Sequence, residues 1–102
     1  MSWGSVGKSL RELRFVFCSS SQHSAGMRQF VAKNYSAIKT QNPQFPLLVR
    51  ECLAADPYII ARYEFGVEKK LFTENLNHEE VGEAVKILVD SAAEVNASLK
   101  KQ

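Results

Sequence analysis

The order strand, helix, strand in the first half of the chain is the feature that most constrains its fold. Large apolar side chains alternate with other types from Leu13 to Cys18, and this period of two predicts a strand over residues 10–18. Apolar residues then recur every three or four positions, which predicts a helix over residues 25–41 with Ser24 as its N-cap.

A short apolar run after this helix predicts the second strand. Asn42-Pro43 ends the helix, because proline disfavours helical backbone in the residue before it and has no N–H to donate. Residues 47–52 alternate little, which is typical of a strand covered on both faces. Two strands joined by a helix of this length form a right-handed crossover, so we expect them to be parallel.

The second half of the chain predicts a hairpin and a second helix. Residues 58–65 have a strand pattern, and Gly66 permits a bend into a short charged strand over residues 70–72 at a sheet edge. Asn77 and Glu80 have the spacing of a capping box. An apolar stripe follows them and predicts a helix over residues 78–98, with Lys100 and Lys101 placed to complement its dipole.

Length and element order together predict one α/β domain. The 102 residues leave room for a single core. The order βαβ then ββα is the minimal thioredoxin-like core, a four-stranded mixed sheet with helices packed on it. We expect one domain over residues 1–102, with an N-terminal extension over 1–9 and a tail over 99–102. Pro57 stands where such folds commonly place a cis-proline, so a cis Asp56–Pro57 bond is expected.

Charge and composition favour docking onto a large partner. Residues 1–40 carry a net charge of +5 and residues 41–102 a net charge of −3, which predicts two faces of opposite potential. The sequence pI of about 8.6 is below the value of about 9 that is usual for nucleic-acid-binding domains. No apolar run approaches the roughly 18–20 residues of a membrane span.

The N-terminal segment has the composition of a mitochondrial presequence. Residues 1–21 contain six serines and three basic residues with a single acid. The strand pattern begins within this segment, at Leu13. We therefore expect the mitochondrial targeting signal to be recognised at the N-terminus of the folded chain.

Cys18 stands at the end of the first strand, which is the redox position of thioredoxin-like folds. Cys18 and the three serines after it read as a C-x-x-S motif. The helix over 25–41 begins too late for its dipole to act strongly on this sulfur, so an ordinary thiol pKa near 8.5 is expected. A structural or disulfide role is therefore favoured over catalysis.

Cys52 ends the second strand as Cys18 ends the first. Neighbouring strands lie about 4.8 Å apart, within reach of a disulfide if both side chains leave the same face. The alternative is a pair of reduced thiols, the usual condition in a reducing compartment. His23 and His78 lack the spacing of a zinc site, so we expect no metal, no cofactor and no catalytic triad.

The chain also resembles a family of accessory subunits of mitochondrial respiratory complex I. The motifs that carry this resemblance span most of the chain and are Leu10 to Phe15, Cys18, Arg28, Phe30, Tyr35, Asn42-Pro43, Pro46-Leu47, Val49 to Cys52, Pro57, Ala61 to Tyr63 and Phe65-Gly66. The resemblance implies a thioredoxin-like fold shared with two mitochondrial ribosomal proteins, and no enzyme activity. It also implies that Cys18 and Cys52 are the family's cysteine pair, able to form an intramolecular disulfide.

The resemblance further implies a partner and a location. The family lies on the matrix-side arm of complex I, peripheral to the inner membrane, against the 75 kDa iron–sulfur subunit. Two alternatives stay open. A mitochondrial ribosomal protein of the same fold would be expected to carry a longer basic tail and fewer acids. A thiol–disulfide oxidoreductase using Cys18 would normally carry the second cysteine of a C-x-x-C motif.

Overall fold

The computed structural model describes residues 10–92, which form four strands and two α-helices. The elements in chain order are β1 (Glu12–Phe17), the 3-10 turn η2 (Gln22–Ser24), α1 (Ala25–Gln41), β2 (Leu47–Glu51), β3 (Tyr58–Arg62), the 3-10 turn η3 (Glu64–Gly66), β4 (Glu68–Phe72) and α2 (His78–Asp90). Within residues 10–92, no helix is long and apolar enough to cross a membrane. The predicted extension over 1–9 and tail over 99–102 lie outside these residues.

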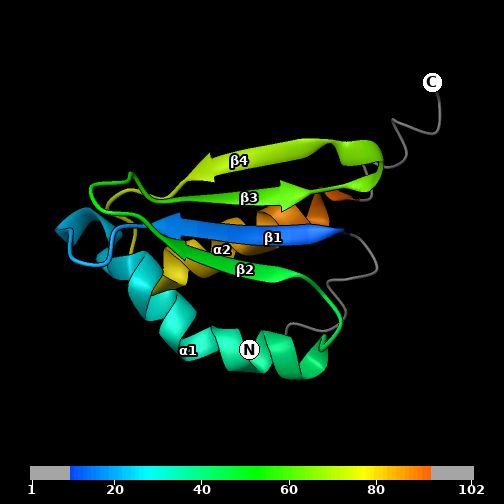
Figure 1. Cartoon of the computed structure of the whole chain (residues 1–102), viewed down its shortest axis with the longest axis horizontal. Coiled ribbons are helices and arrows are strands. Elements are labelled where there is room, and N and C mark those ends of the chain that lie inside the picture. Colours follow the sequence, from blue (N-terminus) through cyan, green and yellow to red (C-terminus); the bar gives the residue numbers. More distant parts are fainter. Residues whose placement is uncertain (1–9, 93–102) are drawn as a thin grey trace.

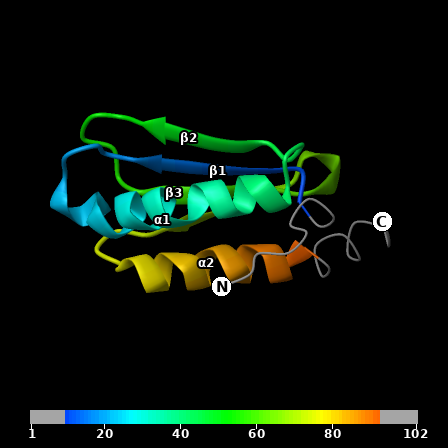
Figure 2. The same cartoon turned by 90° about the horizontal axis from the view of Figure 1, so that it is seen from below.

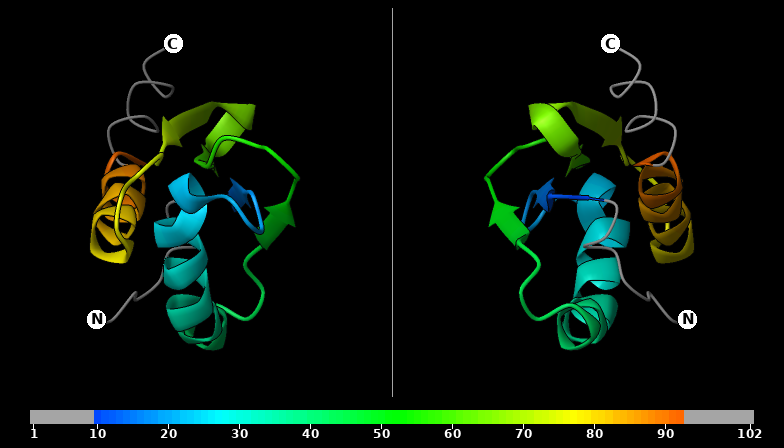
Figure 3. Two further views of the ribbon diagram at one scale, coloured as in Figure 1. Left: turned by 90° about the vertical axis from the view of Figure 1, so that its left-hand side faces the viewer. Right: turned by 90° about the vertical axis from the view of Figure 1, so that its right-hand side faces the viewer.

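The strands form one mixed sheet in the order β2-β1-β3-β4 (Figure 1). β1 is parallel to β2 and antiparallel to β3, and β3 is antiparallel to β4. Both helices pack on the same face of the sheet (Figure 2), and the end-on views of Figure 3 show two layers. This topology is consistent with the predicted thioredoxin-like fold, and the parallel pairing of the first two strands is confirmed.

The alternating side chains of β1 and β3 build the core between sheet and helices. Leu13 and Phe15 of β1 lie beside Ala61 and Ile59 of β3, and all four are buried. Their neighbours in sequence point to the opposite face, because side chains alternate along a strand. Apolar residues of both helices complete the core on the helical side. They are Met27, Phe30, Ile38, Val81, Val85 and Leu88.

Polar contacts fix the second helix against the sheet. The Tyr63 hydroxyl, just after β3, donates to the Leu88 carbonyl of α2 at 2.7 Å. Burial raises the pKa of Tyr63, which keeps this donor protonated.

The predicted capping box at the start of α2 is confirmed. The Asn77 side chain accepts from the Glu80 N–H at 2.9 Å, and the Glu80 carboxylate accepts from the Asn77 N–H at 3.1 Å.

The strand over 47–52 was expected to be covered on both faces, and this prediction is wrong. β2 is an edge strand, and Leu48 and Val49 are 43% and 38% exposed. A run of apolar residues indicates a strand, but it does not show whether that strand lies in the middle or at the edge of the sheet. β4 is the other edge strand, as predicted, and starts two residues earlier than expected.

The bounds of β1, β3 and α2 differ from the sequence predictions, whereas the start of α1 agrees with them. β3 ends at Arg62, because the chain turns through η3 before Gly66, whose φ of 77° confirms the expected bend. α2 ends at Asp90, and the predicted helical residues 93–98 and the lysines after them lie outside the described part. α1 begins as predicted, with Ser24 as N-cap, but the Ser24 side chain bonds elsewhere.

The expected cis bond before Pro57 is also wrong, since residues 10–92 contain no cis peptide. The chain reverses direction before the proline, where Ala54 has a φ of 60° and the Ala55 N–H donates to the Cys52 carbonyl at 3.1 Å. The Asp56–Pro57 bond is trans, the form that X–Pro bonds favour by about 0.5–1 kcal/mol.

Candidate functional site

The two cysteines lie side by side at the ends of β1 and β2. Phe17 and Glu51 are the last paired residues of the parallel ladder, and the Cys52 N–H donates to the Phe17 carbonyl at 2.9 Å. Cys18 and Cys52 therefore occupy the next positions along the two chains. Both are free thiols in this structure, Cys18 buried and Cys52 half-buried. The disulfide between them stays a prediction.

Side chains of η2 and α1 form hydrogen bonds with the loop after β1, near Cys18. The Cys18 N–H donates to the Ser24 hydroxyl at 3.1 Å, which explains why this hydroxyl does not cap α1. The Arg28 guanidinium donates to the carbonyls of Cys18 and Ser21 at 2.9 and 2.6 Å. The loop is thus anchored at both ends by charge-assisted or buried hydrogen bonds.

The pKa of Cys18 is lowered from 9.0 to about 6, so the expected ordinary pKa near 8.5 is wrong. The Ser21 side chain contributes most, followed by the backbone N–H groups of Ser20, Ser21 and Ala54, and burial opposes the shift. These donors stabilise the thiolate, as a helix N-terminus does in some redox proteins. As predicted, α1 does not begin directly after Cys18. The pKa of Cys18 is nevertheless lowered, because the loop supplies the hydrogen bonds.

This arrangement supplies a thiolate with restricted access. At pH 7 a thiol of pKa about 6 is about nine-tenths ionised, which suits it for attack on a disulfide or for metal binding. The residue is only 2% exposed, so a protein disulfide does not reach the sulfur without movement of the loop. The Ser20 hydroxyl lies 3.7 Å from the sulfur.

Loops that are distant in sequence bring His23 close to two carboxylates. The ligand atoms of His23, Asp56 and Glu74 lie within 4.8 Å of one another, and the His23 Nε2 is 3.7 Å from Asp56 Oδ1. The sequence gives no sign of this cluster, because no local spacing links His23 to the two carboxylates and the histidines were considered as ligands only together with the cysteines. His78 lies apart, at the N-terminus of α2. Three such ligands are one fewer than a structural zinc site uses, and exposed carboxylates are often this close without an ion.

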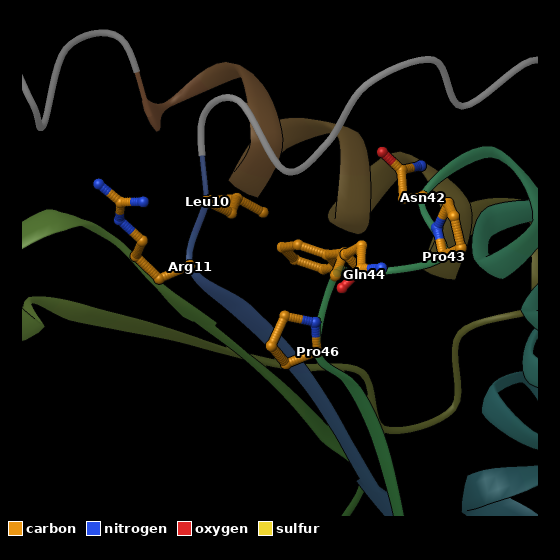
Figure 4. A pocket seen from close by; sticks show the side chains of 7 residues that line it. Leu10, Arg11, Asn42, Pro43, Gln44 and Pro46 are labelled. Atoms are coloured by element: carbon orange, nitrogen blue, oxygen red, sulfur yellow. The ribbon is translucent and has the colours of Figure 1, made fainter.

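A cavity of about 300 Å³ lies at the opposite end of the sheet from the cysteines. It is formed where the chain enters β1 and where it passes from α1 to β2, and its lining residues are Leu10, Arg11, Asn42, Pro43, Gln44, Phe45 and Pro46 (Figure 4). The Arg11 guanidinium lies 3.5 Å from Glu64 at the surface. Among residues 10–92, the lining contains no histidine, cysteine or carboxylate, so these residues offer neither a nucleophile nor a base there.

Comparisons with known proteins give a consistent result. Residues 27–78 match the mitochondrial ribosomal protein L51 / S25 / CI-B8 domain. The chain is 44% identical over 94 residues to NADH dehydrogenase (ubiquinone) 1 alpha subcomplex subunit 2 of Arabidopsis thaliana, covering 91% of this chain and 97% of that protein. It is 43% identical to the NADH-ubiquinone oxidoreductase 10.5 kDa subunit of Neurospora crassa, over 80% and 87% of the two chains. The mouse alpha subcomplex subunit 2 is 38% identical, over 82% and 85%.

Proposed function

The chain belongs to the family of the mitochondrial ribosomal protein L51 / S25 / CI-B8 domain, and we propose that within it the chain is a non-catalytic accessory subunit of respiratory complex I. The observation that carries this proposal is the 38–44% identity, over at least 80% of the chain, to three relatives named as subunits of NADH dehydrogenase or NADH-ubiquinone oxidoreductase. Fold and length agree with it.

The described part of the structure supports a role without chemistry of its own. Cys18 is buried, and the cavity at the far end of the sheet lacks titratable groups other than Arg11. The subunit acts by binding its neighbours and stabilising the assembly. It belongs to the matrix-side arm, peripheral to the inner membrane, with the 75 kDa iron–sulfur subunit as its main contact. The mitochondrial composition of residues 1–21 supports this location.

Native electrophoresis of solubilised mitochondrial membranes, with mass spectrometry of the bands, tests this function. We expect the chain in the band with NADH-oxidising activity, and in the matrix-arm fragment after mild dissociation. Chemical cross-linking within that fragment is expected to join it to the 75 kDa subunit. Recovery only with ribosomes would support the ribosomal alternative, and recovery only as a free matrix protein would contradict both.

A thiol–disulfide exchange activity is the second candidate function, and the lowered pKa of Cys18 favours it. The test is reduction of a mixed disulfide of glutathione by the wild-type chain and by Cys18→Ser, with a thiol reductant in excess. Turnover by the wild type alone would establish this activity. We expect both chains to be inactive, because Cys18 is buried.

A further inference from the structure

The sheet has one face that no described element covers. Both helices lie on the other face, as Figure 2 shows. The register assigns to this open face the side chains of alternate positions on all four strands: Glu12, Arg14, Val16, Leu48, Arg50, Tyr58, Ile60, Arg62, Glu68, Lys70 and Phe72. Since the other sheet face forms the core, this face is the side of the sheet that is left to a partner.

Large apolar side chains stand exposed on this open face. Phe72 is 63% and Leu48 43% exposed. The Phe72 and Tyr58 rings meet edge to face with centroids 5.8 Å apart, and the Lys70 ammonium lies 4.3 Å from the Tyr58 centroid. Aromatic residues and arginine are the types enriched in protein–protein interfaces, and they supply most strong contacts there.

Cationic groups flank a hollow on the same face. A cavity of about 310 Å³ is lined by Arg14, Leu48, Val49 and Arg50. One terminal nitrogen of Arg14 contacts the Glu12 carboxylate at 3.1 Å, whereas its Nε is buried and has no acceptor within residues 10–92. The Arg14 side chain as a whole is 35% exposed, so a partner carboxylate in this hollow can form a charge-assisted hydrogen bond with its guanidinium.

The open face and α2 carry opposite net charge, whereas α1, which lies in the same layer as α2, carries the three cations Arg28, Lys33 and Lys39 and no carboxylate. The exposed positions of α2 carry four carboxylates, at Glu79, Glu80, Glu83 and Asp90, against the single cation Lys86. The open face carries four cations, Arg14, Arg50, Arg62 and Lys70, against the two carboxylates of Glu12 and Glu68. An acidic partner is therefore attracted to the sheet side and repelled by the α2 side.

We propose that the open face of the sheet docks an acidic segment of a neighbouring complex I subunit. A carboxylate of that segment binds between Arg14 and Arg50, and an apolar side chain packs on Tyr58 and Phe72. A protein segment fits better than nucleic acid, because the pI of about 8.6 is below the value of about 9 that is usual for nucleic-acid-binding domains. This inference rests on the proposed function.

The test is to replace the chain in cells by tagged versions and to measure the fraction of tag in the complex I band on native gels. Arg50→Glu and Phe72→Ala alter two exposed residues of the open face. Lys86→Glu and Ile87→Ala are matched controls on α2, where Ile87 is 58% exposed. Circular dichroism of each purified chain checks that it is folded.

We expect Arg50→Glu to lower the incorporated fraction roughly tenfold, since like charges facing each other cost more than the 1.4 kcal/mol of one decade. Phe72→Ala lowers it several-fold, and both controls stay at the wild-type level. If all four variants match the wild type, or if the controls lose as much as the open-face variants, the docking proposal is overturned while the proposed function stands.

Two other outcomes separate the remaining possibilities. If the tagged wild type is absent from complex I, the proposed function fails, and the docking proposal falls with it. A mixed-sequence single-stranded RNA, titrated onto the purified chain at physiological salt, gives the nucleic-acid outcome. Binding that Arg50→Glu abolishes would replace the acidic protein segment as the occupant; no binding is expected.

Discussion

Hydrogen bonds from a serine-rich loop, and not a helix dipole, determine the chemistry of Cys18. Its pKa falls to about 6 because the Ser21 side chain and the N–H groups of Ser20, Ser21 and Ala54 point at the sulfur. Three of these donors are close in sequence, but Ala54 comes from the loop after β2. The thiolate environment is therefore completed only when β1 and β2 pair.

Titration of the Cys52→Ser variant, in which Cys18 is the only cysteine, measures this pKa directly. We expect the ultraviolet absorbance of the thiolate to appear with a midpoint near pH 6. Ser21→Ala removes the largest contribution and raises the midpoint. Ser19→Ala is the matched control in the same loop and leaves it unchanged. A midpoint near the ordinary thiol value in the Cys52→Ser variant would refute the hydrogen-bonded thiolate.

The same shift makes stability depend on pH. The pKa of Cys18 is 9.0 in its ordinary state and about 6 in the fold, so between these values the unfolded chain binds more protons. The Cys18 contribution is fully present above about pH 9 and is lost as pH falls through about 6. We expect the difference in unfolding free energy between wild type and Cys18→Ser, measured in urea with reductant, to increase as the pH rises from about 6 to about 9. A constant difference would exclude the linkage.

The pairing of Cys18 with Cys52 leads to a separate prediction about oxidation. The positions are neighbours across the parallel pair, and a disulfide there would constrain the unfolded chain by ~3–4 kcal/mol in the entropy model. We expect oxidant to raise the Tm of the wild type and to leave Cys18→Ser unchanged. Mass spectrometry of the oxidised chain identifies the bond, and a Tm that oxidant does not move would contradict the prediction.

At the scale of elements, the two helices differ in how closely their glycines approach neighbours. A Cβ at Gly26, on α1, would overlap the Leu76 carbonyl just before α2, whereas a Cβ at Gly82 would meet the Phe30 ring at 3.4 Å. The first neighbour is backbone and cannot move alone. The second is an ordinary van der Waals contact with a side chain.

Alanine substitution at these two glycines is expected to have opposite effects. Gly26→Ala forces the start of α1 away from the loop and lowers the free energy of unfolding by about 1–3 kcal/mol. Gly82→Ala gains helix propensity and raises it by up to about 1 kcal/mol. Urea unfolding of both variants tests this. Equal effects of the two substitutions would show that the close approach to Leu76 does not limit the position of α1.

At the scale of the whole molecule, one core joins both helices to one face of the sheet. The residues of this core come from every described strand except β4 and from both helices. We therefore expect a single cooperative unfolding transition. Far-ultraviolet circular dichroism reports the helices and near-ultraviolet circular dichroism reports buried Tyr63, and the two curves should coincide in urea. Separate midpoints would show that α2 unfolds independently.

The tertiary structure also determines which charged side chains lie together on the surface. Along the sequence, the net charge is +5 over residues 1–40 and −3 over residues 41–102. In the fold, Arg62 and Lys70 of the acidic second part join Arg14 on the open face, while the carboxylates of α2 lie on the other layer. The contrast in charge thus lies between the open face and α2 and does not follow the halves of the chain.

The sequence by itself determined the order of the elements, the parallel pairing of β1 with β2, the capping box at Asn77 and the family. These features depend on local periodicity, on cap residues and on the handedness of one crossover, all of which short segments encode. The edge position of β2, the trans Pro57, the pKa of Cys18 and the meeting of His23 with Asp56 were decided by the tertiary structure. Each depends on groups far apart in sequence, whose distances are set only when the sheet forms.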